Sequence, residues 1–186
     1  MKKAIIINGF GGVGKDTFID TLRSEFNYNH QGQTIYDAKW NIESFSSVDI
    51  IKEAAKLLGW DGVSKDLKSR RFLHDLKNLV TEYNDGCLLY MKTTFERIHD
   101  SDYLTNLIFF HIREPKEIDK AKEALNAIVI YVKNDNVPRN DHNLEDKDIE
   151  NYPYDYIVDN SGTLEDLKQE AAKFIEWIGK QINEGE

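Results

Sequence analysis

The sequence predicts an α/β protein, a three-layer α/β/α sandwich around a five-stranded, mostly parallel sheet. Short, continuously apolar segments of strand length alternate along the chain with longer segments whose apolar residues recur at helical spacing. Strands and helices that alternate in this way form parallel sheets through right-handed crossovers, so helices should cover both faces. No repeat, low-complexity tract or Pro/Gly-rich linker divides the 186 residues, which predicts a single domain over residues 1–186.

The chain is expected to begin with a buried strand and its helix. Residues 3–8, KAIIIN, form a continuous apolar run, as in a strand that is covered on both faces. A glycine-rich loop follows, and the spacing of Phe18, Ile19, Leu22 and Phe26 predicts a helix over residues 14–26. A second strand is expected in residues 32–38, in residues 40–46, or in both.

A helical excursion is expected over about residues 49–100, between the second and third strands. Apolar residues recur at helical spacing in 50–58, 67–83 and 88–98, with Gly59 and Gly86 at the ends of the first two stretches. The strand–helix alternation then resumes with a strand at 106–112, a helix from Pro115 and a strand at 127–132. A polar, lid-like loop at about 133–150 leads to a strand at 154–159 and a helix over 164–182, for which Thr163 and Asp166 form an N-cap pair.

Composition and charge exclude some classes of binding partner for this protein. The net charge of −9 opposes binding to a nucleic-acid polymer or to an anionic membrane surface. No segment approaches the length of a membrane span, and the apolar run after Lys3 is too short for a signal peptide. Cys87 is the single cysteine, so no intramolecular disulfide forms. We therefore expect a cytoplasmic protein with small-molecule partners, and the sequence leaves a homodimer open.

The loop NGFGGVGKDT, residues 8–17, fits two phosphate-binding patterns. Its glycines spell G-x-G-x-x-G, the turn that holds a dinucleotide, and they also spell G-x-x-x-x-G-K with Lys15. The dinucleotide pattern needs an acidic residue at the end of the second strand, for which Asp37 is the candidate. It also favours small or apolar residues after the third glycine, where this chain has Lys15 and Asp16. The triphosphate pattern is therefore favoured.

A nucleoside triphosphate is the ligand that this pattern predicts. Main-chain amides of residues 11–15 can surround the phosphates at the start of a helix, and Lys15 can bridge the outer phosphates. The residues expected to bind the triphosphate are Gly11, Gly12, Val13, Gly14, Lys15, Asp16 and Thr17. Asp16 stands where the pattern has Ser or Thr. It can hold Mg²⁺ directly or through water, or it can cap the helix and pair with Lys15, and both roles stay open.

The GKDT stretch resembles the P-loop of the deoxynucleoside monophosphate kinases of bacteriophages and their bacterial relatives, in the nucleoside monophosphate kinase group. Four further stretches are loosely similar to that group: residues 44–60, 111–118, 141–145 and 156–167. The resemblance implies a P-loop NTPase fold and ATP-dependent phosphorylation of a (deoxy)nucleoside monophosphate with Mg²⁺. It also implies that the turn at 160–163, including Gly162, lies against the adenine, although a helix-capping turn explains the same residues.

Phosphoryl transfer needs positive charge around both substrates. Arg113 follows a central strand, at the edge where α/β sheets bind ligands, and is expected to be catalytic together with Lys15 and Asp16; a surface salt bridge is the alternative for Arg113. Arg70 or Arg71, on the helical excursion, is expected to clamp the acceptor phosphate; a solvated helix face is the alternative.

Asp49 can contact the sugar or base of the acceptor, or serve only as an N-cap. Arg139, His142 and Glu145 lie in the lid-like loop, for which an ordinary charged loop is the alternative. His111 stands where similar kinases have an aspartate, and histidine is a poor Mg²⁺ ligand.

Three alternatives follow from these observations. A P-loop kinase for another small phosphorylated metabolite shares every motif. A non-catalytic nucleotide-binding protein is left open by His111. An NAD-type oxidoreductase is left open by the glycine pattern and Asp37.

Overall fold

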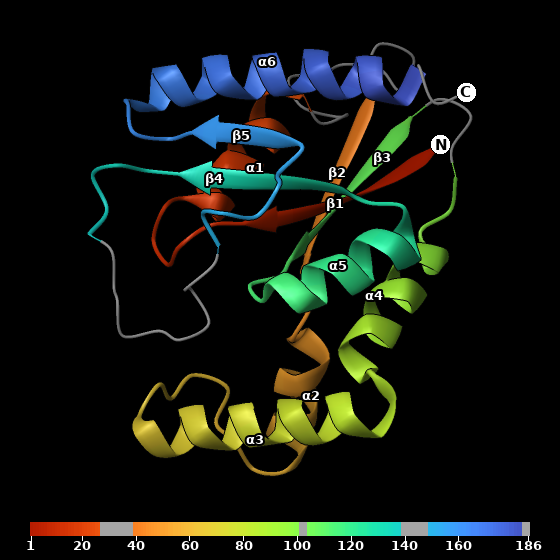
Figure 1. Cartoon of the computed structure of the whole chain (residues 1–186), viewed down its shortest axis with the longest axis vertical. Coiled ribbons are helices and arrows are strands. Elements are labelled where there is room, and N and C mark those ends of the chain that lie inside the picture. The colour runs from red at the N-terminus through yellow and green to blue at the C-terminus, as the bar shows by residue number, and fades with distance from the viewer. Residues whose placement is uncertain (27–38, 101–103, 139–148, 184–186) are drawn as a thin grey trace.

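Five parallel strands form one sheet in the order β2-β3-β1-β4-β5 in the computed structural model, which describes residues 1–26, 39–100, 104–138 and 149–183 (Figure 1). The central strand β1 pairs with β3 on one side and β4 on the other, and every neighbouring pair is parallel. The strand bounds are β1 Lys2–Asn8, β2 Trp40–Ser46, β3 Thr105–His111, β4 Ile128–Lys133 and β5 Tyr156–Asp159.

Helices cover both faces of the sheet, as the sequence predicts. Along β1, Ile5 and Ile7 join a core with α1 (Lys15–Phe26) and α6 (Leu164–Asn183), whereas Ala4 and Ile6 join a second core with α5 (Pro115–Leu125). The division follows from the alternation of side chains along a strand, because both faces of β1 are covered. The α/β/α sandwich is therefore confirmed, with a sheet that is parallel throughout the described strands.

Three helices lie between β2 and β3, as expected for the excursion: α2 Asp49–Leu57, α3 Leu67–Asn84 and α4 Gly86–Arg97. Figure 1 shows α3 lying apart from the sheet, on the far side of α2 and α4. No side chain of α3 is buried, whereas α4 places Met91 in the core beneath α5. Asp85 has a left-handed backbone, with φ of 51°, and turns the chain from α3 into α4.

Several boundaries differ from the sequence prediction. The second strand is residues 40–46, and the alternative at 32–38, with Asp37, lies outside the described residues. The last strand begins at Tyr156 rather than at residue 154. The Asp155 carboxylate accepts a hydrogen bond from Val129 N (2.8 Å), so a side chain replaces the next bond of the strand ladder. Within the described residues, no helix is long and apolar enough to cross a bilayer.

Replacement of Phe174 by alanine should strongly destabilise the fold. Phe174 is fully buried on α6 and meets the rings of Phe18, Phe109 and Tyr156. Loss of a buried aromatic ring leaves a cavity and lowers the free energy of unfolding by about 3–5 kcal/mol. Urea unfolding of Phe174→Ala measures this loss. The matched control is Leu164→Ala on the same helix, where the side chain is exposed; an equal loss in the two variants would contradict the packing described.

Candidate phosphate-binding site

The loop between β1 and α1 has a backbone that requires glycine at defined places. Gly9, Gly12 and Gly14 have φ values of +144°, +84° and +90°. A Cβ at Gly9 would collide with the carbonyl oxygen of Val132, and one at Gly14 would collide with the side chain of Asn160. At Gly11 a Cβ would meet no atom within 4 Å. Conformation and close approach therefore explain Gly9 and Gly14, while Gly11 leaves open space at the mouth of the loop.

Lys15 begins α1 and folds back over the loop. Its Nζ donates hydrogen bonds to the carbonyl oxygens of Gly9 (2.6 Å) and Phe10 (2.9 Å), and the residue is half-buried. The positive charge thus lies beside the amino end of a helix, where partial positive charge also collects. A bound anion would compete with two neutral carbonyls for this ammonium group, so the loop has the charge and the geometry of an anion site.

Asn8 is the last residue of β1 and is fully buried. Its Oδ1 accepts a hydrogen bond from Gly9 N (2.7 Å), and its Nδ2 donates to the carbonyl oxygen of Arg113 (3.3 Å). One side chain therefore satisfies the first amide of the glycine loop and also ties that loop to the end of β3. A buried amide that is partnered at both ends specifies one arrangement of the two segments.

The turn after β5 lies against the same loop. Asn160 Nδ2 donates a hydrogen bond to the carbonyl oxygen of Val13 (2.8 Å), and Asn136 Nδ2 donates to the carbonyl oxygen of Ser161 (2.6 Å). Gly162 follows in this turn and is exposed. Thr163 and Asp166 exchange hydrogen bonds at the start of α6, so the helix-capping interpretation of the turn is also satisfied.

A second cluster of polar side chains lies at the ends of β2 and β3. His111 Nε2 is 3.1 Å from Ser44 Oγ and 3.5 Å from Asp16 Oδ1, so the two strands and the start of α1 meet at one imidazole. Burial lowers the pKa of His111 below its ordinary value of 6.5, and this effect outweighs the opposing influence of Asp16. The imidazole is therefore neutral at pH 7, with one ring nitrogen that donates and one that accepts a hydrogen bond.

Asp49 has a different local role from the N-cap that the sequence offers. Val48 occupies the N-cap of α2, without a side-chain capping bond, and Asp49 is the first helical residue. The Asp49 carboxylate accepts a hydrogen bond from Ser46 N (2.8 Å) and pairs with Lys52 (3.0 Å). It thereby fixes the turn from β2 into α2. This turn lies close to His111, because Ser47 N donates a hydrogen bond to the His111 carbonyl oxygen.

Of the three arginines expected at the site, Arg113 lies beside the loop, whereas Arg70 and Arg71 are bonded to neighbours near α3. Arg113 is the second residue after β3, its carbonyl oxygen bonds Asn8 beside the loop, and its side chain is exposed. Arg70 Nε donates to the carbonyl oxygen of Lys65 (2.8 Å), and Arg71 pairs with Asp75 at 3.6 Å, both within or beside α3. Arg139, His142 and Glu145 lie outside the described residues.

The protein oxygens near the loop suit a metal ion that is held mainly by phosphate and water. Within the described ranges no group of three or more His, Cys, Asp or Glu side chains converges as a metal cage. Mg²⁺ at nucleotide sites takes only one or two protein oxygens beside phosphate oxygens and water. The exposed carboxylate of Asp16 and the exposed hydroxyl of Thr17, in the first turn of α1, are oxygen donors of that kind.

Sequence reasoning did not single out Asn8 and Ser44, and it saw Asn160 only as part of a turn. Asn8 and Ser44 share one signal, which is a polar residue at or near the carboxyl end of a strand. Such residues lie at the ligand-binding edge of a parallel sheet. Their partners, Arg113 and His111, are more than 60 residues away in the sequence, so the pairing itself has no local signal.

The sheet order separates this fold from the dinucleotide-binding one. In that fold the first strand lies between the second and the fourth, whereas here β1 lies between β3 and β4. In this sheet β3 lies between β2 and β1. An acidic residue after β2 would therefore lie one strand further from the glycine loop than in the dinucleotide-binding fold.

Comparison with known proteins gives distant structural likenesses only. No protein-family model matches the sequence, and no curated protein matches it. Among the solved structures that match, three are similar over nearly the whole chain. A tunicamycin resistance protein from Deinococcus radiodurans is 16% identical with a TM-score of 0.45, covering 94% of this chain and 96% of that one. An unliganded sugar kinase from Janibacter sp. is 11% identical with a TM-score of 0.41, covering 95% of each chain. A dephospho-CoA kinase from Campylobacter jejuni is 17% identical with a TM-score of 0.45, covering 95% and 97%.

Acidification should weaken the fold through His111. The pKa of His111 is lowered in the folded chain, so between pH 6.5 and that lower pKa the unfolded state binds more protons than the folded state. The free energy of unfolding should therefore fall as the pH falls below about 6.5, and the loss should end below the folded pKa. Urea unfolding at a series of pH values should show a flatter dependence for His111→Gln than for the original chain.

His74→Gln is the matched control, since it removes an exposed imidazole from α3. A pH dependence that is unchanged in His111→Gln, or flattened equally in the control, would contradict the burial that lowers the pKa of His111.

Proposed function

We propose that this protein is a kinase that transfers a phosphoryl group from ATP to a small acceptor, with a (deoxy)nucleoside monophosphate as the first candidate. The observation that carries the proposal is the glycine loop with Lys15 folded over it, at the carboxyl edge of a parallel sheet and at the start of a helix. Phosphoryl transfer depends on the positioning and neutralisation of charge more than on covalent chemistry by the protein. A loop of this kind supplies both.

The donor side of the proposed site is the better defined. Amides of residues 11–15 and the amino end of α1 would hold the phosphates of ATP, and Lys15 would leave its carbonyl partners to bridge the outer phosphates. Asp16, with Thr17, would hold Mg²⁺ together with phosphate and water. The turn that contains Gly162 would lie beside the adenine, because Asn160 already fastens that turn to Val13 of the loop.

The acceptor side would lie between the strand ends and the helical excursion. Arg113 is beside the loop and would neutralise the transferring phosphate. Arg70 or Arg71 would bind the acceptor phosphate after a change of position, because both are engaged with neighbours near α3. Asp49, near the end of β2, would meet the sugar or base. Substrates of this size are small molecules of the cytoplasm, and the proposal needs neither a polymer nor a membrane.

A second candidate, transfer to a hydroxyl group of another small metabolite, is favoured by His111. A phosphate acceptor is already an anion and needs no base, whereas an alcohol loses a proton when it is phosphorylated. A neutral imidazole 3.1 Å from Ser44 Oγ, at the carboxyl edge of β3, has the chemistry to take that proton. An NAD-type oxidoreductase is disfavoured by the sheet order.

Lys15→Ala should abolish turnover if the proposal is correct. The ammonium group would follow charge that develops on the transferring phosphate, so its loss should lower kcat by a factor of about 10² or more. A coupled assay of ADP release measures this with ATP and each (deoxy)nucleoside monophosphate in turn, followed by sugars and other hydroxyl acceptors. The monophosphates and the hydroxyl acceptors thus separate the two candidates.

Lys173→Ala is the control, because Lys173 is an exposed lysine of α6 that pairs with Glu170. Tight ATP binding without ADP release from any acceptor would reject the kinase and leave a non-catalytic nucleotide-binding protein. Binding of NAD in preference to ATP would reject the nucleoside triphosphate site altogether.

A further inference from the structure

Lys77 makes a contact that sets it apart from the other residues of α3. Its ammonium group bonds Glu114 Oε1 and Glu117 Oε1, the latter at 2.9 Å, and its side chain is only 16% exposed. Burial by itself would lower the pKa of Lys77, but the hydrogen bonds with Glu114 and Glu117 raise it, so the group stays charged. The helix is otherwise poorly anchored, because no residue of α3 reaches the burial of a core side chain.

The partners of Lys77 connect α3 to the phosphate-binding loop. Glu114 is the N-cap residue of α5 and directly follows Arg113. The carbonyl oxygen of Arg113 accepts from Asn8 Nδ2, and Asn8 Oδ1 accepts from Gly9 N. A continuous path of bonded groups thus runs from the excursion through the 113–114 turn to the first glycine of the loop. The ion pair lies at one end of this path and a fully buried amide at the other.

We propose that Lys77 is a positioning residue for Arg113, and that it couples the placement of the acceptor-side helices to the catalytic edge of the sheet. The inference rests on the proposed kinase function. The Lys77 ammonium group bonds the carboxylate of Glu114, and Asn8 Nδ2 bonds the carbonyl oxygen of Arg113. The backbone of residue 113 is therefore fixed between a contact with α3 and a contact with the glycine loop. Arg113 itself has an exposed side chain, so its direction depends on this backbone. A small misplacement of such a group lowers the rate of transfer sharply.

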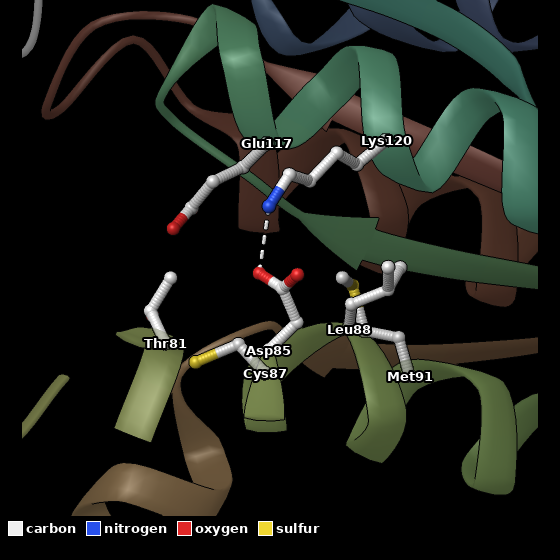
Figure 2. Close-up of a pocket in the computed structure, with 7 residues that line it drawn as sticks. All are labelled: Thr81, Asp85, Cys87, Leu88, Met91, Glu117 and Lys120. Atoms are coloured by element: carbon white, nitrogen blue, oxygen red, sulfur yellow. Dashed lines mark hydrogen bonds and ion pairs between the residues drawn. The ribbon is translucent and has the colours of Figure 1, made fainter. Parts of the chain in front are cut away.

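A second ion pair, between Lys120 and Asp85, also connects α5 to the end of α3, but it does not involve Glu114. Figure 2 shows Lys120 of α5 reaching Asp85 at the turn between α3 and α4, at 2.7 Å, beside the Glu117 side chain and the small pocket lined by Thr81, Cys87 and Met91. Both partners are more exposed than Lys77, with side-chain exposures of 52% and 43%. Lys120 is on α5, and its partner Asp85 is not bonded to the 113–114 turn. Loss of this pair weakens the contact between α5 and the turn after α3, but it leaves the bonds that connect Lys77 with residue 113 in place.

Three variants test the inference. Lys77→Met keeps an unbranched side chain, one atom shorter, and removes the charge. Lys77→Arg keeps the charge, and Lys120→Met removes the ion pair with Asp85. In the ADP-release assay, with the acceptor that the original chain uses, Lys77→Met should lower kcat about tenfold while the KM for ATP changes less than about twofold. Lys77→Arg should restore most of kcat, and Lys120→Met should keep it.

Amide hydrogen exchange gives a readout that needs no activity. Exchange at residues 112–114 should become faster in Lys77→Met and stay unchanged in Lys120→Met, with both measured where urea unfolding shows that the chain is folded. If Lys77→Met does not fold, Glu114→Ala removes the carboxylate that bonds Lys77, leaves Lys77 paired with Glu117, and should show the same fall in kcat and the same faster exchange.

The outcomes separate this inference from the proposed function. Equal kcat in Lys77→Met and Lys120→Met, or unchanged exchange at 112–114, overturns the positioning role even though the protein is a kinase. If the original chain transfers no phosphate to any acceptor, the kinase proposal fails and with it the catalytic purpose of the link. Exchange at 112–114 then decides by itself whether α3 is coupled to residue 113.

Discussion

The side chain of Asn8 is a buried amide at the end of the central strand, and its two hydrogen bonds fix the glycine loop against the segment after β3. It accepts from the first amide of the glycine loop and donates to the carbonyl oxygen after β3, so two segments more than 100 residues apart share one fixed position. An unpaired polar group at a site with no solvent exposure would be costly, which makes the paired arrangement strongly preferred. The loop that leaves β1 therefore starts from a rigid point.

Rigidity at this point explains the backbone that follows. The chain passes so close to Val132 of β4 that Gly9 admits no side chain, and it then turns through positive φ at Gly12 and Gly14 into α1. On the other side Asn160 bonds Val13, so β1, β4 and the turn after β5 together fix the main chain of the loop around the Lys15 ammonium. A main chain that is fixed in this way needs little reorganisation for the proposed binding of an anion, in which Lys15 exchanges its two carbonyl partners for the anion.

The acceptor side is built on a different principle. Residues of α3 contribute no buried side chain, and the helix contacts α2 and α4 and forms charged pairs with α5. Contacts of this kind are weaker and more easily rearranged than a packed apolar core. The structure thus combines a glycine loop held by side-chain amides with a helix α3 that contacts α5 through ion pairs, whereas α2 and α4 of the same excursion bury Ile51 and Met91. Arg70 and Arg71 lie on the excursion, away from the strand ends, so an excursion that moves is a requirement of the proposed transfer.

The sequence by itself determined the alternation of strands and helices, the helical excursion, and the glycine loop with Lys15. These features rest on local signals, which are side-chain periodicity within one element and the conformations that only glycine adopts. Tertiary structure alone decided the order of the strands, the meeting of His111 with Asp16 and Ser44, the bond from Asn160 to Val13, and the link from Lys77 to Glu114. It also showed Asp49 bonding Ser46 rather than capping its helix, and the two excursion arginines bonded locally. The strand order and the contacts between distant residues depend on which elements become neighbours and in what register, whereas the bonds of Asp49, Arg70 and Arg71 are local. Contacts between residues distant along the chain leave no periodic trace in a single sequence, because each partner's identity is compatible with many other partners.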